Sequence, residues 1–437
     1  MFQLLFVSED SFIIFKQFRS VIKPTQYIVL LFLLPLLMSA CRKKGCTDPI
    51  ASNYSESAQI DDASCEYLDV TSQLRAEVMT QYADIVYFTY EDCYLEALVM
   101  QEKVSSFLES PSQEGLEECR EAWMLTRRPF EQAEVFRFYE GPIDGGYSRL
   151  SEWMIDPSYI DYVSGDPFSG IIWDSENFKT IDEEELIDAN QSEGETKVTI
   201  GFHVIEFLLW GEDTASPSQL TPGMRGFNDF AANDSAATDK IRRSQYLEAA
   251  TSILVADLAS LVKDWSSSES GNYRQSFLGM NSTKGFRMIL TGMIRSAETE
   301  LAHNRLRVSL DSLDTEREVS KFSDNTSTDV LMTTIGLRNV FEGKYARVDS
   351  SIISGASVLD VASLIDDTLS NEIHDAVNAS VKASALILSP FDYRLSEEFA
   401  AESSISNTAS ELENLSKLLI ELGRKLGYEI DPTIRTR

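Results

Sequence analysis

The residues best placed to do chemistry are His203 and Glu206. They stand three positions apart in a mainly apolar stretch, Thr199 to Trp210, so on a helix both side chains leave the same face. One imidazole nitrogen and one carboxylate oxygen at this spacing can ligate a single iron or manganese ion. The same residues can equally form a hydrogen-bonded contact in a buried core, and the spacing alone favours that interpretation. Gly201 would let another backbone or a ligand approach the start of this helix.

Few other residues could support catalysis. The chain has three histidines, and His303 and His374 lie in charged segments that we expect to face solvent. The stretch around His203 lacks the second histidine and the adjacent glutamate of the H-E-x-x-H zinc peptidases. No nucleophile elbow surrounds a serine or cysteine, so the sequence identifies no catalytic residue.

The overall charge restricts the class of partner. Acidic residues number 70 and basic residues 38, which gives a formal net charge of -32. Such a chain repels a phosphate backbone unless it carries a local basic patch, and none is visible, so we expect no nucleic-acid partner. The acidity keeps a solvent-facing surface soluble, or it provides a field that concentrates cations; charge alone does not separate these alternatives.

The first 40 residues have the features of an export signal. A twelve-residue apolar run, Tyr27 to Met38, is too short to span a bilayer, follows basic residues and precedes Ser39-Ala40-Cys41. Small residues before a cysteine resemble the bacterial lipobox. We therefore expect residues 1–40 to be a lipoprotein signal peptide and Cys41 to be the lipid anchor, rather than an incidental cysteine in a buried N-terminal helix. The expected location is the outer membrane or cell surface of a Gram-negative-type bacterium, facing the periplasm or the medium.

Residues 41–69 form a linker and a short module bracketed by Cys46 and Cys65. The segment is rich in turn-forming residues and has almost no apolar periodicity, so it cannot build its own core. In an oxidising compartment, a disulfide between the two cysteines would supply the missing order. Polar side chains of the module could bind Ca²⁺, although we favour turn and cap roles for them; they are Asp48, Asn53, Asp61 and Asp62. For Cys93 and Cys119 we predict no simple bridge.

The rest of the chain has the periodicity of packed helices. Apolar residues recur at spacings of three and four from Leu74 to Phe88, from Leu254 to Trp265 and from Leu412 to Leu426. Ser110-Pro111-Ser112 predicts a helical hairpin turn, and no Gly-rich phosphate loop follows a strand pattern. We therefore predict an all-α fold with two helical bundle-like domains, 70–215 and 216–437, and a site where they meet.

Short blocks along the chain resemble the imelysin family. The stretch Gly201-Phe-His203-Val-Ile-Glu206 matches its G-x-H-x-x-E signature. The other blocks that resemble the family are Trp123 with Arg127, Pro129 and Phe130; Glu134 to Phe138; Gly141 to Asp144; Trp153 to Asp156 with Tyr159 to Asp161; Glu300 to Ala302; Ser320 to Thr326 with Asp329; and Gly336 to Tyr345. Their order and spacing make the resemblance specific over roughly residues 70–437.

The resemblance implies an imelysin-like, all-helical, exported protein that binds iron or an iron-bearing ligand and acts in iron uptake. Zinc or calcium would be the alternatives to iron as the bound ion. The partners would be membrane lipid at Cys41 and an iron-uptake receptor or transport system. Two alternatives stay open: a metallopeptidase that uses the same His/Glu pair on a metal-bound water, and a structural or adhesive surface lipoprotein.

The resemblance also implies candidate site residues. The metal ligands would be His203, Glu206, Glu134 and Asp324, with Glu318 as a further oxygen donor, and the ligand-binding residues would be Arg127, Asp144, Gly201 and Ser323. Arg127 could clamp a carboxylate, and Glu134 could instead pair with Arg137 on a helix surface. Val319 and Ser327 stand where the family is expected to have histidines, so this chain would bind a metal differently or more weakly.

Overall fold

The structure, a computed structural model, describes residues 43–47, 49, 53–65, 69–232, 237–395 and 403–433. The chain forms two compact units, Met1–Val70 and Thr71–Arg437. The predicted signal peptide, the anchor Cys41 and the candidate calcium ligand Asp48 lie outside the described residues and stay predictions.

The first unit contains the cysteine-bracketed module. Cys46 and Cys65 form the predicted disulfide, and β1 (Lys44–Gly45) pairs in parallel with β2 (Ile60–Asp61). The side chains of Asp61 and Asp62 accept hydrogen bonds from the backbone N–H groups of Ala63 and Ser64, both at 3.1 Å. These two carboxylates therefore cap turns, which is the role that the sequence favoured for them.

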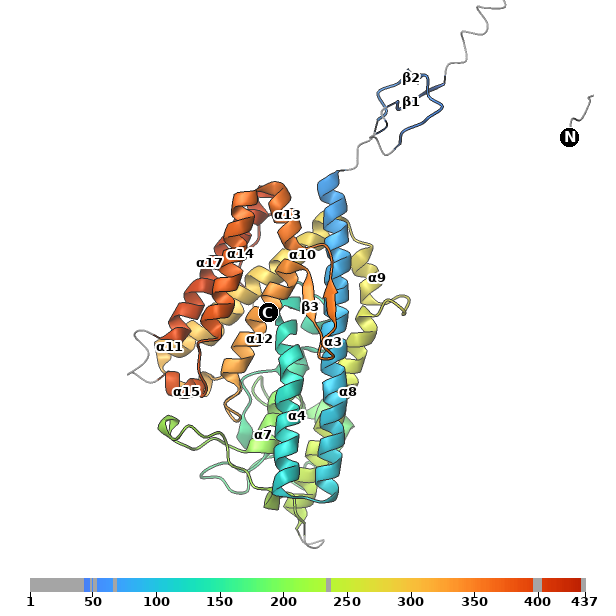
Figure 1. Ribbon diagram of the computed structural model, residues 1–437. Helices are drawn as coiled ribbons and strands as arrows, with labels where there is room; N and C mark the ends of the chain where they lie inside the picture. Colours follow the sequence, from blue (N-terminus) through green and yellow to red (C-terminus); the bar gives the residue numbers. More distant parts are fainter. Residues whose placement is uncertain are drawn as a thin grey trace, which may run out of the picture. The chain divides into compact units, whose positions relative to one another are not determined.

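The second unit is helical apart from one small hairpin, which confirms the predicted all-α fold class. Its α-helices, drawn in Figure 1, are α3 (Val70–Glu109), α4 (Gln113–Gln132), α5 (Pro157–Ile160), α6 (Glu183–Ala189), α7 (Phe202–Trp210), α8 (Thr238–Trp265), α9 (Tyr273–Leu278), α10 (Ser282–Arg295), α11 (Val308–Ser312), α12 (Thr326–Glu342), α13 (Val358–Ile365), α14 (Asp367–Ser384), α15 (Phe391–Arg394) and α17 (Ser404–Lys425). A π-helical stretch, η6 (Ser296–Arg307), joins α10 to α11. The 3-10 turns are η1 (Ala133–Phe136), η2 (Pro142–Asp144), η3 (Ser148–Ser151), η4 (Pro217–Gln219), η5 (Phe227–Asp229) and η7 (Thr315–Arg317).

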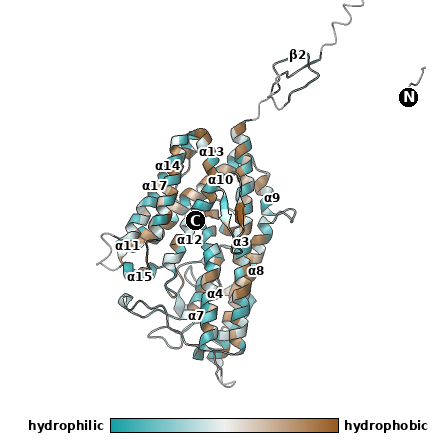
Figure 2. Cartoon of the chain, in the orientation of Figure 1, coloured by the Kyte–Doolittle hydropathy of each residue, from teal (hydrophilic) through white to brown (hydrophobic). Residues whose placement is uncertain are grey.

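The predicted helices form where the apolar residues repeat. Helices α3 and α4 make the expected hairpin: Ser112 caps α4 by accepting a hydrogen bond from the Gly115 N–H, and Lys103 pairs with Glu118 at 2.9 Å. The leucine stripe of α17 is buried, and hydrophilic and hydrophobic residues alternate along that helix in Figure 2. Among the described residues, no helix combines the length and the apolar character that a membrane crossing requires.

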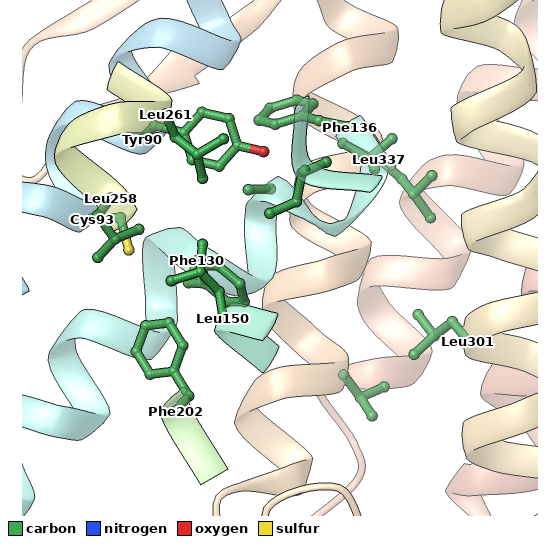
Figure 3. Close-up of a cluster of buried hydrophobic side chains, with 14 of the residues drawn as sticks. Tyr90, Cys93, Phe130, Phe136, Leu150, Phe202, Leu258, Leu261, Leu301 and Leu337 are labelled. Atoms are coloured by element: carbon green, nitrogen blue, oxygen red, sulfur yellow. The ribbon is translucent and has the colours of Figure 1, made fainter. Parts of the chain in front are cut away.

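Helices distant in sequence share the core of the second unit. Helix α12 packs on α4 and α14, α17 packs on α14 and η6, and α8 packs on α6 and α7. Figure 3 shows side chains from α3, α4, α7, α8 and α12 gathered in one buried cluster, among them Cys93, Phe130, Phe202, Leu258 and Leu337. Because α8 follows residue 216 yet packs on helices that precede it, the two predicted halves are in contact. The division at 215/216 itself stays a prediction.

A short hairpin interrupts the helical pattern. Strands β3 (Lys344–Ala346) and β4 (Ile352–Ser354) pair antiparallel after Gly343, which ends α12 in a left-handed conformation with φ of 62°. The Tyr345 hydroxyl donates to Asp92 Oδ2 at 2.9 Å and fastens the hairpin to α3. Three-residue strands leave too little alternation for a sequence pattern to reveal.

The contact between α4 and α12 depends on a glycine. A Cβ at Gly336 would meet the backbone carbonyl oxygen of Gln132 far inside contact distance. We expect Gly336→Ala to lower the free energy of unfolding by about 1–3 kcal/mol, because α12 must move away from α4. Urea unfolding measures the change, with Gly146→Ala as the matched control, since a Cβ there meets nothing within 4 Å. Equal stability of the two variants would show that this helix contact is not tight.

Candidate functional site

Helix α7 carries the His203/Glu206 pair into the interior. All nine of its residues, Phe202 to Trp210, are buried. Its N-cap, Gly201, has φ of 99°, and a Cβ there would collide with the backbone carbonyl of Arg149 and lie 2.8 Å from that of Leu150. The predicted close approach at Gly201 is therefore made by the backbone of η3, and only glycine permits it.

His203 and Glu206 are bonded to each other. His203 Nδ1 lies 2.9 Å from Glu206 Oε2, and both side chains are almost completely buried. Burial lowers the pKa of His203 well below its usual value of 6.5, and the nearby positive charge of Arg127 lowers this pKa further. The neutral ring donates from Nδ1 to the carboxylate, so Nε2 is left as an acceptor, 3.5 Å from Ser151 Oγ.

Glu206 also holds the loop that precedes α12. Its Oε1 accepts hydrogen bonds from the backbone N–H groups of Phe322 and Ser323, at 3.1 and 3.0 Å, and from the Ser323 hydroxyl at 2.7 Å. Burial raises the pKa of Glu206 to about 7 in spite of these donors. Both oxygens of Glu206 thus have hydrogen-bond partners within the protein, Oε2 with His203 and Oε1 with Phe322 and Ser323. Metal ligation by His203 and Glu206 stays a prediction, and Ser323 serves as a partner of Glu206.

A buried ion network surrounds the pair. Arg127 pairs with Glu131 and donates from Nη2 to Asp329 Oδ2 at 2.9 Å. Arg305 donates to Glu131 and to Glu134, both at 3.1 Å. The carboxylate that Arg127 was predicted to clamp is thus supplied here by the protein's own residues. Removing one member would leave an unpaired buried charge, so this network stabilises a single arrangement of α4, η6 and α12.

Two other predicted site residues have structural partners. Glu134 pairs with Arg137 at 3.0 Å, but the predicted surface position is wrong for this pair, because Glu134 is 1% exposed and also binds Arg305. Asp144 accepts hydrogen bonds from the backbone N–H groups of Phe138, Tyr139 and Gly141 and so ties the loop around η2 together.

The described residues contain one cluster whose geometry suits a metal ion. Carboxylate oxygens of Glu318, Asp324 and Asp392 lie within 4.8 Å of one another. Glu318 Oε1 and Asp324 Oδ1 are buried without a hydrogen-bond partner. Burial, together with the neighbouring carboxylates, raises the pKa of Glu318 well above 4.5, that of Asp324 to about 7 and that of Asp392 above 3.8. Three carboxylates held this close repel one another unless protons or a cation compensate them.

The cluster adjoins a cavity of about 400 Å³ that Glu318 and Asp392 line. Glu212, Asp213 and Glu316 line it as well. Lys321 is the one lysine or arginine among the described lining residues, and it is paired with Glu316 at 2.5 Å. The potential in this cavity therefore attracts cations, and hard oxygen donors suit Fe³⁺, Ca²⁺ or Mn²⁺.

Some of these residues had no clear signal in the sequence. Asp392 lies 68 positions beyond Asp324 and outside every block that resembles the family. Ser151 and Arg305 join the site through contacts between residues distant in sequence, such as Ser151 with His203, 52 positions apart, and Arg305 with Glu131, 174 positions apart. The irregular, acidic tract from Glu140 to Asn190 was the one available hint for Ser151.

The raised carboxyl pKa values predict an unusual pH dependence. A carboxyl whose pKa is raised by folding contributes stability that is present below its unfolded pKa, about 4, and is lost as the pH rises through its folded pKa, about 7 here. The lowered pKa of His203 has the opposite effect and makes the free energy of unfolding rise with pH below about pH 6.5. Three groups with raised pKa values, Glu206, Glu318 and Asp324, outweigh this single histidine. We expect the free energy of unfolding in metal-free buffer to fall between about pH 5 and pH 7, by about 1 kcal/mol per pH unit for each net proton.

Urea unfolding at a series of pH values measures this slope, and Glu318→Gln should reduce it because the substitution removes one titrating group. A stability that rises steadily from pH 5 to pH 7 would contradict the assignment of protons to these buried carboxyl groups.

Comparisons with known proteins agree with the family resemblance indicated by the G-x-H-x-x-E stretch. A family model described as imelysin matches residues 86–421. Iron-regulated protein A of Synechococcus elongatus is 23% identical over 269 residues, which cover 60% of this chain and 62% of the relative. The chain thus spans less than two thirds of that relative's length.

Two solved structures share the fold. A protein of Parabacteroides distasonis described as an iron-regulated protein A precursor superposes with a TM-score of 0.62 at 17% identity, covering 81% of this chain and 95% of its own. An imelysin-like protein of Psychrobacter arcticum gives a TM-score of 0.53 at 14% identity, covering 83% and 98%. Because the family model covers most of the sequence and the residues it matches include the G-x-H-x-x-E stretch, this chain belongs to the imelysin family.

Proposed function

We propose that this protein binds a hard metal cation, with ferric iron as its cargo, at Glu318, Asp324 and Asp392, and that it acts in iron uptake. The observation that carries the proposal is the set of three neighbouring carboxylates beside an acidic cavity, two of which, Glu318 and Asp324, each have one buried oxygen without a hydrogen-bond partner. A cation would remove their mutual repulsion and satisfy these oxygens at once. The name of the Synechococcus relative supports an iron-related role.

The G-x-H-x-x-E residues take a positioning role in this proposal. Glu206 holds the peptide groups of Phe322 and Ser323, which directly precede Asp324. His203 holds Glu206 in turn. The Trp153 indole N–H donates to the Glu318 carbonyl at 3.1 Å and fixes the other end of the loop. Ligands held by such supporting hydrogen bonds keep their geometry without a bound ion.

The setting proposed for this function is the cell envelope. A lipid at Cys41 would tether the protein to the outer membrane or cell surface. An uptake receptor or transport system is the proposed partner that delivers or accepts the ion. Zinc and calcium are the competing ions, and oxygen-only donors favour calcium over zinc among these two.

Substitution of the carboxylates tests the binding site. We expect Glu318→Gln with Asp392→Asn to weaken binding by at least about tenfold, since loss of supporting contacts alone has that effect at metal sites. Equilibrium dialysis followed by metal analysis for iron, calcium, manganese and zinc measures the bound ion. The matched control is Glu316→Gln, which removes a carboxylate from the same cavity that is already paired with Lys321.

Two results would contradict the proposal. If wild type and the double variant retained equal amounts of every ion, the cluster would not be the binding site. If binding were unaffected by the double variant but lost on His203→Gln, the ion would belong to the His203/Glu206 pair.

A further inference from the structure

We propose that Ser151, His203 and Glu206 form a nucleophile, base and orienting acid that hydrolyse a small carboxylic ester. This activity is separate from the proposed metal binding and requires no metal ion. The residues come from two elements, η3 and α7, and their order in space matches the roles of a serine hydrolase triad.

The hydrogen bonds define these roles. Glu206 Oε2 lies 2.9 Å from His203 Nδ1, which leaves Nε2 free to accept, and Nε2 lies 3.5 Å from Ser151 Oγ. Arg127 Nη1 donates to Ser151 Oγ at 3.3 Å. Because Oγ accepts from the guanidinium, its own proton is directed to Nε2. Nucleophile–base distances of this length are common without substrate and shorten when it binds.

Gly201 brings the nucleophile and the base together. Ser151 is the last residue of η3, and the backbone of η3 lies against Gly201, two residues before His203. Arg149, in the same turn, binds Asp257 of α8 through two hydrogen bonds of 2.8 and 2.7 Å. Helix α8 therefore anchors one side of η3. On the other side, η3 can pack closely against α7 because Gly201 has no side chain.

Ser151 is reachable from solvent, whereas the base behind it is shielded. Ser151 is half-buried and lines an open cavity of about 300 Å³ with Trp153 and Asn304. Arg137, Arg305 and Arg317 line the same cavity together with Glu152 and Glu300, and two of these arginines are ion-paired, Arg137 with Glu134 and Arg305 with Glu300. Guanidinium N–H groups beside the nucleophile can donate to the negative charge that develops on a carbonyl oxygen during attack. A cavity of this size admits a short acyl group.

The reaction balances with water as the only co-reactant. Ser151 Oγ attacks the ester carbonyl carbon while its proton passes to His203 Nε2. The bond from the carbonyl carbon to the alcohol oxygen breaks, and that oxygen takes the proton from the imidazolium. Water, deprotonated by His203, then attacks the acyl-serine, which releases the carboxylic acid and restores the hydroxyl.

A fluorophosphonate probe tests the nucleophile in the full-length protein, and peptide mass spectrometry locates the labelled serine. Hydrolysis of 4-nitrophenyl acetate, in the presence of a metal chelator, provides a rate. We expect labelling at Ser151 and its loss in Ser151→Ala, and a drop in both readouts of at least about 100-fold in His203→Gln. The control Ser260→Ala, at a half-buried serine on α8 that bonds only to the Ala256 carbonyl among the contacts described, should leave both unchanged.

Ser151→Cys adds a readout that does not depend on the substrate. Its thiol should react with iodoacetamide faster in the wild-type background than beside His203→Gln, whereas a residue with a purely structural role would show no such difference. The proposal is overturned if folded wild-type protein takes no label at Ser151, if Ser151→Ala keeps the full hydrolysis rate, or if the two cysteine variants react equally fast.

Discussion

The buried carboxylate of Glu206 is the interaction on which the rest of this site depends. A charge in an apolar helix must be satisfied from elsewhere in the fold, and here one oxygen takes the imidazole of His203 while the other takes three donors from Phe322 and Ser323. The same residue thereby orients a base toward Ser151 and fixes the loop that carries Glu318 and Asp324. One side chain connects two cavities with different chemistry.

The buried carboxylates on the two sides of Glu206 differ in whether they have arginine partners. On the side of α4 and η6, each buried carboxylate of the network has an arginine partner, as Glu131 and Glu134 have Arg305. On the side of the loop, neither Glu318 nor Asp324 pairs with an arginine among the described residues, and one oxygen of each carboxylate is left without a hydrogen bond. Proteins retain such uncompensated groups at functional sites because the cost in stability is repaid on binding. Because the carboxylates near α4 and η6 are already paired with arginines and those of the loop are not, we assign the metal ion to the loop that carries Glu318 and Asp324.

Sequence patterns predicted the parts of the fold that rest on local periodicity. The helices around Leu74, Leu254 and Leu412 follow from spacings of three and four, and Cys46 and Cys65 bracket a module that needs a disulfide. The pairing of His203 with Glu206 follows from one turn of helix. Contacts such as Glu206 with Ser323, 117 positions apart, and the arrival of Asp392 beside Glu318 have no local signature, because tertiary packing alone creates them.

The most direct test is anomalous diffraction from crystals of this protein grown with ferric iron. Ion binding at the acidic cluster predicts an iron peak within coordination distance of Glu318, Asp324 and Asp392, with the hydrogen bonds from Phe322 and Ser323 to Glu206 intact. A peak between His203 and Glu206, or an iron-loaded crystal with no peak at the cluster, would contradict it.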